Sequence, residues 1–280
     1  MCHPIILPNK QAQPLAWSSM MLENKCALVT GSIRGLGYAI AQDLAKAGCH
    51  VILHGLEPED LAHDAADKLR QASGRTVLLS RADLARVDQI EELMQTALQQ
   101  FGNVDIVVNN AVVRHFSPAE ELSALHWDES IAVNLSAAFH TSRLAIPGMR
   151  ARAWGRIINM SSVYGSSAAV NRVGYVTTKT GLIGMTRTIA LETATSGITC
   201  NAVCPGTVPT PAILERIAGM AAKAGISQEQ ATHEYLAQRQ PTGRFVAMES
   251  VAALVRFLCS EAGRDITGSV LPIDGGWTAA

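Results

Sequence analysis

Tyr175 and Lys179 stand four residues apart near the end of a stretch, residues 158–179, whose side chains could exchange protons with a substrate. If a helix starts near Gly174, both side chains lie on one helix face, about one turn apart. A nearby ammonium group lowers the pKa of a phenol from its usual value of about 10. Ser162, in the loop before this helix, can bond the same substrate oxygen. The pattern predicts a phenol that acts as a general acid or base, although a surface helix can carry such a pair by chance.

A glycine-rich loop near the N-terminus predicts a second kind of chemistry. Gly31, Gly35 and Gly37 lie between a short apolar strand, 26–30, and a helical pattern, 38–47. Glycines let the backbone approach a pyrophosphate, and the N-terminus of the following helix favours negative charge. Because strand, loop and helix follow in this order, we expect the loop to bind a dinucleotide rather than to serve only as a turn.

The next strand, 50–54, bears on the identity of that dinucleotide. An acid directly at its end would hold the ribose diol of NAD, but Gly55 and Leu56 occupy that place and Glu57 comes slightly late. Arg34 in the glycine loop is a candidate partner for the 2′-phosphate of NADP, or else a solvated side chain. We expect NAD, with NADP left possible because of Arg34.

The composition is typical of an α/β protein. Of the 280 residues, 48% are hydrophobic and only 5% are aromatic, as in a sheet buried on both faces. The formal net charge is −1 and no basic block is present, which argues against nucleic acid and anionic membranes as partners. No window is apolar enough to span a membrane.

Strand-like and helix-like segments alternate along the chain and should position these residues. Strands are predicted at 26–30, 50–54, 76–80, 104–108, 156–160, 198–203 and 269–273, and helices at 38–47, 61–72, 87–101, 128–153, 174–195 and 250–260. Such alternation predicts a single Rossmann-type, doubly wound parallel sheet with helices on both faces. Ligands should bind at the carboxyl ends of the strands. Residues 207–245 form a mostly helical excursion that could act as a lid.

The cysteines and the N-terminal segment add two expectations. Four of the six cysteines fall in or beside apolar strands and none lies at zinc spacing, so we predict reduced core thiols, a cytoplasmic location and no metal site. Residues 1–20 contain three prolines and lack the pattern of a signal peptide. We interpret them as a flexible tail before a domain at 21–280.

Together these motifs resemble the short-chain dehydrogenase/reductase family. The chain carries Thr-Gly-x-x-x-Gly-x-Gly from Thr30, Asn-Asn-Ala from Asn109, and a serine thirteen residues before the tyrosine. The resemblance implies the catalytic residues Asn134, Ser162, Tyr175 and Lys179. It implies a cofactor site of Gly31, Ser32, Arg34, Gly35, Leu36, Gly37, Leu56, Asp83, Leu84, Asn110, Ala111, Tyr175, Lys179, Pro205, Gly206, Val208 and Thr210. One departure is Val112, which replaces a family glycine and narrows the approach to the cofactor ribose.

Within the family, the chain looks most like bacterial 3-hydroxybutyrate dehydrogenases, for example in its ending Asp-Gly-Gly-Trp-Thr-Ala. The resemblance implies interconversion of a small anionic secondary alcohol and its ketone, and a homotetramer assembled through the two long helices and the last strand. It places the substrate among Arg114, Ser162, Tyr164, Arg172, Tyr175, Thr207, Arg216 and Trp277. A catalytically silent NAD(P)-binding regulator and a reductase of a bulky ketone are the less favoured alternatives.

The implied pocket gains two positive charges, Arg114 and Arg216, over the resembled enzymes, and Arg172 replaces a lysine. Arginine suits bidentate capture of oxyanions. An alternative substrate is therefore a more strongly anionic hydroxyalkyl sulfonate, phosphonate or dicarboxylate. Any one of these arginines could instead face solvent or pair with an acid such as Glu215.

Overall fold

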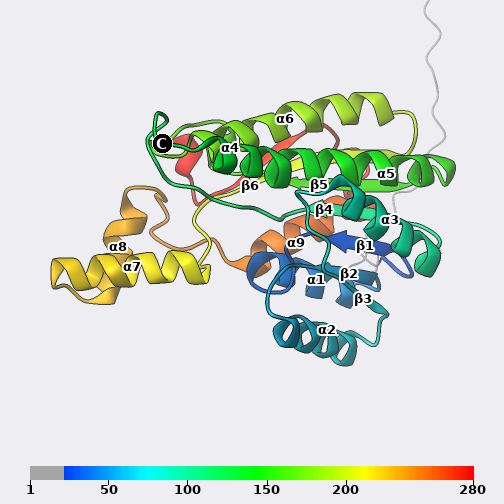
Figure 1. Ribbon diagram of the computed structural model, residues 1–280, viewed down its shortest axis with the longest axis horizontal. Helices are drawn as coiled ribbons and strands as arrows, with labels where there is room; N and C mark the ends of the chain where they lie inside the picture. Colours follow the sequence, from blue (N-terminus) through cyan, green and yellow to red (C-terminus); the bar gives the residue numbers. More distant parts are fainter. Residues whose placement is uncertain (1–21) are drawn as a thin grey trace, which may run out of the picture.

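The computed structural model describes residues 22–280, and its centre is a sheet of seven parallel strands in the order β3-β2-β1-β4-β5-β6-β7 (Figure 1). The strands are β1 Cys26–Val29, β2 His50–His54, β3 Val77–Ser80, β4 Ile106–Asn109, β5 Gly155–Met160, β6 Ile198–Pro205 and β7 Val270–Ile273. This order confirms the predicted doubly wound sheet. The order reverses between β1 and β4, which is where such sheets bind ligands.

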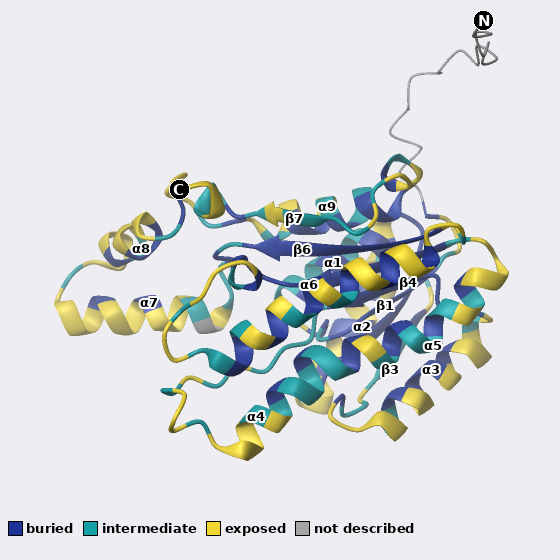
Figure 2. Ribbon diagram, turned by 90° about the horizontal axis from the view of Figure 1, so that it is seen from above, coloured by how far each residue is buried: buried dark blue, intermediate teal, exposed yellow. Residues whose placement is uncertain are grey.

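Helices cover both faces, as predicted (Figures 1 and 2). The helices of the main body are α1 Gly35–Lys46, α2 Glu59–Ser73, α3 Val87–Phe101, α4 Ala124–Ile131, α5 Ala137–Ala151, α6 Val173–Thr193 and α9 Met248–Cys259. Alternate residues of one strand face opposite sides of a sheet. Ala27 and Val29 of β1 therefore pack in the core beneath α1, α2 and α9, whereas Leu28 packs in the core beneath α3, α5 and α6.

The predicted long helix 128–153 contains a π-helical turn that the sequence analysis did not predict. A π-helical turn at Ala132–Ser136 separates α4 from α5. Asn134 lies in this turn, where its side-chain oxygen accepts a hydrogen bond from Val113 N at 2.8 Å and its amide donates to Val113 O at 3.0 Å. The wider turn thus lets a helix side chain hold the backbone of the β4–α4 loop. Such π turns are frequent at functional sites.

A buried chain of polar side chains fixes the end of β4 to β5 and to the two long helices behind them. Asn109 donates to Asn159 at 2.8 Å and accepts from Thr141 of α5 at 2.7 Å, and Asn159 donates to Thr186 of α6 at 2.9 Å. A buried polar group left unpaired costs about 1–3 kcal/mol. The network therefore favours one placement of α6 against the strand ends.

The predicted excursion folds as two helices, α7 (Pro211–Ala224) and α8 (Gln228–Ala237), which project beyond the body of the sheet (Figure 1). The two helices pack on each other through a small core of their own, which contains Ile217, Ala231 and Leu236. β6 ends at Pro205, alongside Ile273 of β7, two residues beyond the predicted end at residue 203, and the strand still ends before the predicted excursion begins.

The remaining sequence expectations have mixed outcomes. The five cysteines among residues 22–280 are buried and free, as expected of core thiols. No described helix is long and apolar enough to cross a membrane, and the described residues contain no cluster of metal-binding side chains. The predicted tail, residues 1–20, lies outside the described residues.

Candidate active site

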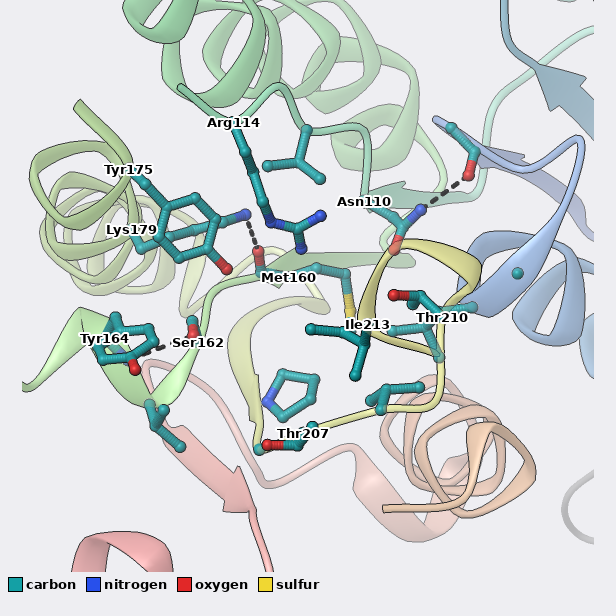
Figure 3. Close-up of a pocket in the computed structure, with 18 of the residues that line it drawn as sticks. Asn110, Arg114, Met160, Ser162, Tyr164, Tyr175, Lys179, Thr207, Thr210 and Ile213 are labelled. Carbon is teal, nitrogen blue, oxygen red and sulfur yellow. Dashed lines mark hydrogen bonds between the residues drawn. The ribbon is translucent and has the colours of Figure 1, made fainter. Parts of the chain in front are cut away.

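A cavity of about 650 Å³ opens at the carboxyl ends of the central strands (Figure 3). It runs from the glycine loop after β1 to the helical excursion. All eight predicted substrate residues and most of the predicted cofactor residues line it. The predicted cofactor residues that line it are Gly31, Arg34, Gly35, Leu36, Gly37, Asn110, Ala111, Tyr175, Lys179, Pro205, Gly206, Val208 and Thr210.

Four predicted cofactor residues do not line this cavity. The Ser32 hydroxyl is buried and donates to Val29 O while it accepts from His54 N, so it joins β1 to β2. The Asp83 carboxylate accepts from Ala85 N in its own loop. Leu84 packs in a small core against Ile90. Leu56 is an exposed side chain at the end of β2.

Lys179 is buried in the floor of the cavity, and its ammonium group donates to Met160 O at 2.6 Å (Figure 3). It lies 5.7 Å from the centre of the Tyr175 ring, one helical turn away on α6. Burial is the main cause that lowers the pKa of Lys179 from its ordinary value, and the Tyr175 phenol partly opposes the effect. The predicted pair on one helix face is therefore present.

The phenol of Tyr175 is the group whose ionisation this site controls. Burial raises its pKa, but the charges of Lys179 and Arg114 and hydrogen bonding to Ser162 and Arg114 act the other way, so the net pKa is lowered from 10.0. The Arg114 guanidinium lies 5.3 Å from the centre of the Tyr175 ring, and both side chains line the same cavity (Figure 3). Arg114 thus helps to lower the pKa of the proton-transfer group, a role that the sequence did not indicate.

Asn134 contacts this site indirectly and does not line the cavity. Its amide is engaged with the Val113 backbone and approaches Thr178 Oγ1 at 3.4 Å. Arg114 follows Val113 in the same loop. The π turn and Asn134 therefore determine where the Arg114 backbone stands relative to Tyr175.

The end of the cavity near the excursion is rich in arginine and aromatic side chains. The Arg172 guanidinium lies 4.7 Å from the Phe116 ring centre and 5.2 Å from that of Tyr164, which in turn packs edge-to-face on Trp277. Arg216 of α7 also lies over Phe116, at 5.4 Å. Within residues 22–280 neither arginine forms an ion pair, so pairing with Glu215 is not what holds Arg216.

The opposite end is suited to a dinucleotide. A Cβ at Gly37 would lie 2.1 Å from Gly31 O, and one at Gly31, where φ is +62°, would lie 2.8 Å from Ala111 Cα. The Asn110 amide braces this loop by donating to Thr30 O and Gly31 O. Space is thus left for a pyrophosphate at the N-terminus of α1, and the residues present fit the cofactor.

Several lining residues were missed as site residues. They are Glu57, Val112, Phe116, Met160, Ser161, Val163, Pro211, Ile213, Tyr235 and Arg239. Glu57 carried a signal, because it follows the end of β2; its carboxylate lies 3.4 Å from Arg34 Nε. Phe116, Tyr235 and Arg239 carried none, since only folding brings the β4–α4 loop and the excursion to the same cavity.

A dinucleotide-type loop and a buried Tyr–Lys pair across one sheet edge define an oxidoreductase that acts on a CH–OH group with a nicotinamide cofactor. A family profile described as enoyl-(acyl carrier protein) reductase matches residues 31–278. The chain belongs to the short-chain dehydrogenase/reductase family.

Two curated relatives cover nearly the whole chain. The D-beta-hydroxybutyrate dehydrogenase of Cupriavidus necator is 43% identical over 92% of this chain and 100% of its own length. The enzyme of the same name from Rhizobium meliloti is 42% identical over 91% and 99%. Among solved structures, the L-sorbose reductase of Gluconobacter frateurii complexed with NADPH and L-sorbose has a TM-score of 0.89 at 30% identity, covering 94% of this chain and 99% of its own.

Replacing Arg114 should change the pH dependence of turnover. Arg114→Gln removes a charge that lowers the pKa of Tyr175, so the phenol should ionise at higher pH. Alcohol oxidation needs the ionised phenol as base, and the rise of kcat/KM with pH should therefore shift to higher pH, as measured by steady-state kinetics of alcohol oxidation.

Two variants control this measurement. Arg216→Gln also removes a cavity arginine but should leave the position of the profile unchanged. Tyr175→Phe should abolish turnover at every pH while NADH fluorescence still reports binding. An unshifted profile in Arg114→Gln, or near-normal turnover in Tyr175→Phe, contradicts the assigned role of the phenol.

Proposed function

We propose that the protein interconverts a small hydroxy acid such as 3-hydroxybutyrate and its keto acid. The names of the two curated relatives described above support this substrate. The observation that carries the proposal is the juxtaposition of a phenol with a lowered pKa, Tyr175, with Arg172 and Arg216 at one end of the cavity. Neither arginine forms an ion pair with any residue that the structure describes. A hydroxy acid offers one group to each: the hydroxyl to Tyr175 and the carboxylate to the arginines.

The roles of the residues follow from their positions. The alcohol oxygen lies between Ser162 and Tyr175, and the phenolate takes the hydroxyl proton. Lys179 keeps the phenol ionisable, with its ammonium held by Met160 O. A nicotinamide dinucleotide would supply the hydride acceptor, and the glycine loop, Asn110 and Lys179 would hold it. The arginines orient the carboxylate so that the carbinol carbon faces the cofactor.

The arginines also favour a second candidate, a more strongly anionic hydroxyalkyl sulfonate, phosphonate or dicarboxylate. Arg239 of the excursion, whose guanidinium lies 4.0 Å from the Tyr235 ring centre, adds a further cation to the same cavity. The relatives' names favour the hydroxy acid, so we place it first. A turnover panel that compares 3-hydroxybutyrate with its sulfonate and phosphonate analogues distinguishes the two.

Removing one arginine should weaken turnover of the anion selectively. Charge-assisted hydrogen bonds contribute about 1.5–3 kcal/mol each, so Arg216→Gln should lower kcat/KM for the preferred anionic substrate roughly tenfold to a hundredfold. Arg172→Lys should cost less, because it keeps the charge and loses only the planar fork. Steady-state kinetics with an uncharged methyl ketone serve as the control. Equal losses on charged and uncharged substrates would contradict the anion-binding role.

For the cofactor we propose NAD rather than NADP. Glu57 lies beside Arg34 and is the only carboxylate among the described residues that line the cavity. This carboxylate supports NAD, because it can accept hydrogen bonds from a ribose diol and its charge opposes a 2′-phosphate near Arg34. The L-sorbose reductase neighbour was solved with NADPH, so the choice requires a direct test.

Arg34→Ser distinguishes the two cofactors. If NAD is preferred, this change should leave KM for NAD nearly unchanged, because the Arg34 side chain is mostly exposed, whereas Glu57→Gln should raise it. Measuring KM and turnover with NAD and with NADP provides the comparison. A loss of NADP turnover far larger than that of NAD in Arg34→Ser would instead assign Arg34 to a 2′-phosphate.

We also propose a homotetramer assembled through α5, α6 and the last strand. Phe139 of α5 and Leu191 of α6 are large apolar side chains that stay exposed on the single chain, at 49% and 80%, and an interface would cover them. Sedimentation equilibrium at micromolar concentration should give four times the chain mass. A stable monomer would contradict the assembly.

A further inference from the structure

Phe116 connects three segments that are distant in sequence. It lies in the loop between β4 and α4, and its ring is approached by Arg172, at the N-cap of α6, and by Arg216, on α7. The Phe116 side chain is 52% exposed, so it is not buried as a core residue. Its described contacts with charged groups are the two guanidiniums, 4.7 and 5.4 Å from the ring centre.

Two like charges on one wall of a cavity repel each other. Burial is the main cause that lowers the pKa of Arg172, the Tyr164 phenol opposes it, and the charge of Arg216 lowers that pKa further. No acidic residue in the described part of the chain pairs with either arginine. The face of an aromatic ring attracts a guanidinium, so the ring can hold both cations near each other without neutralising them.

We propose that Phe116 is a positioning residue that holds Arg172 and Arg216 together as the binding site for the substrate's anionic group. The inference rests on the hydroxy-acid function proposed above and adds a residue to it. Because α7 belongs to the excursion, the same ring fixes the excursion against the catalytic helix α6. Phe116 acts through the arginines and takes no part in proton transfer.

The two arginines depend on this ring to different degrees. Arg172 has a second aromatic neighbour, Tyr164, at 5.2 Å. Arg216 has no aromatic contact other than Phe116 among residues 22–280. Loss of the ring should therefore displace Arg216 more than Arg172. A Phe116 variant should consequently behave like an Arg216 variant.

The test is Phe116→Leu, which keeps an apolar side chain and removes the aromatic face. KM for 3-hydroxybutyrate should rise about threefold to tenfold, in the range of such contacts, with kcat and KM for NAD nearly unchanged. Reduction of an uncharged methyl ketone should not change. Phe116→Trp should restore the wild-type KM, because it restores the ring face.

Two further variants make the test specific. Val170→Ala alters an exposed side chain two residues before Arg172 and should have no effect, which controls for disturbance of that loop. The double variant Phe116→Leu with Arg216→Gln should be little worse than Arg216→Gln alone, because both changes remove the same contact.

Three results would overturn the role of Phe116 while the hydroxy-acid function stands. The first is an active Phe116→Leu enzyme with unchanged KM for 3-hydroxybutyrate, and the second is an equal loss of activity on charged and uncharged substrates. The third is a double variant in which the effects of the two substitutions are fully additive. Failure of the wild type to oxidise any hydroxy acid, sulfonate or phosphonate of the panel overturns the proposed function itself, and the role of Phe116 with it.

Discussion

Lys179 places an ammonium group in the interior of the protein, and the surrounding structure offsets the free-energy cost of burying that charge. Taking a charge out of water is costly unless it finds hydrogen bonds. Met160 O at the end of β5 supplies one at 2.6 Å. The bond ties α6 to the sheet edge and thereby sets the position of Tyr175. The buried Asn109–Asn159–Thr186 chain holds the same helix from behind.

Arg114 extends this electrostatic arrangement from the opposite side of the phenol. Its position derives from a local departure from helical geometry, since the π turn directs Asn134 toward the Val113 backbone. Two cations thus face one phenol from two elements. Burial raises the pKa of Tyr175, but the two charges together with hydrogen bonding to Ser162 and Arg114 outweigh it, so the net pKa is lowered.

The two ends of the cavity differ in how they treat charge. At the glycine loop, the glycines carry no side chain, so the backbone and the dipole of α1 can contact a pyrophosphate. Glu57 lies beside Arg34 at the same end. At the excursion, Arg172 and Arg216 share the Phe116 ring, and no carboxylate in the described part of the chain forms an ion pair with either arginine. A carboxylate bound there would meet uncompensated positive charge, whereas the other end already carries both signs.

The spacing of apolar residues along the sequence determined the order of strands and helices. The spacing of a few glycines and of Tyr175 and Lys179 determined the glycine loop and the shared helix face. All of these features depend on residues that are near one another along the chain. Tertiary structure decided what depends on distant segments. The helix expected at 128–153 contains a π-helical turn, in which Asn134 pairs with a loop some twenty residues earlier. Asn134, Asp83 and Ser32 proved to bond backbone groups outside the cavity. Phe116 contacts both Arg172 and Arg216 only because three segments that are distant in sequence meet in the fold, which no local pattern encodes.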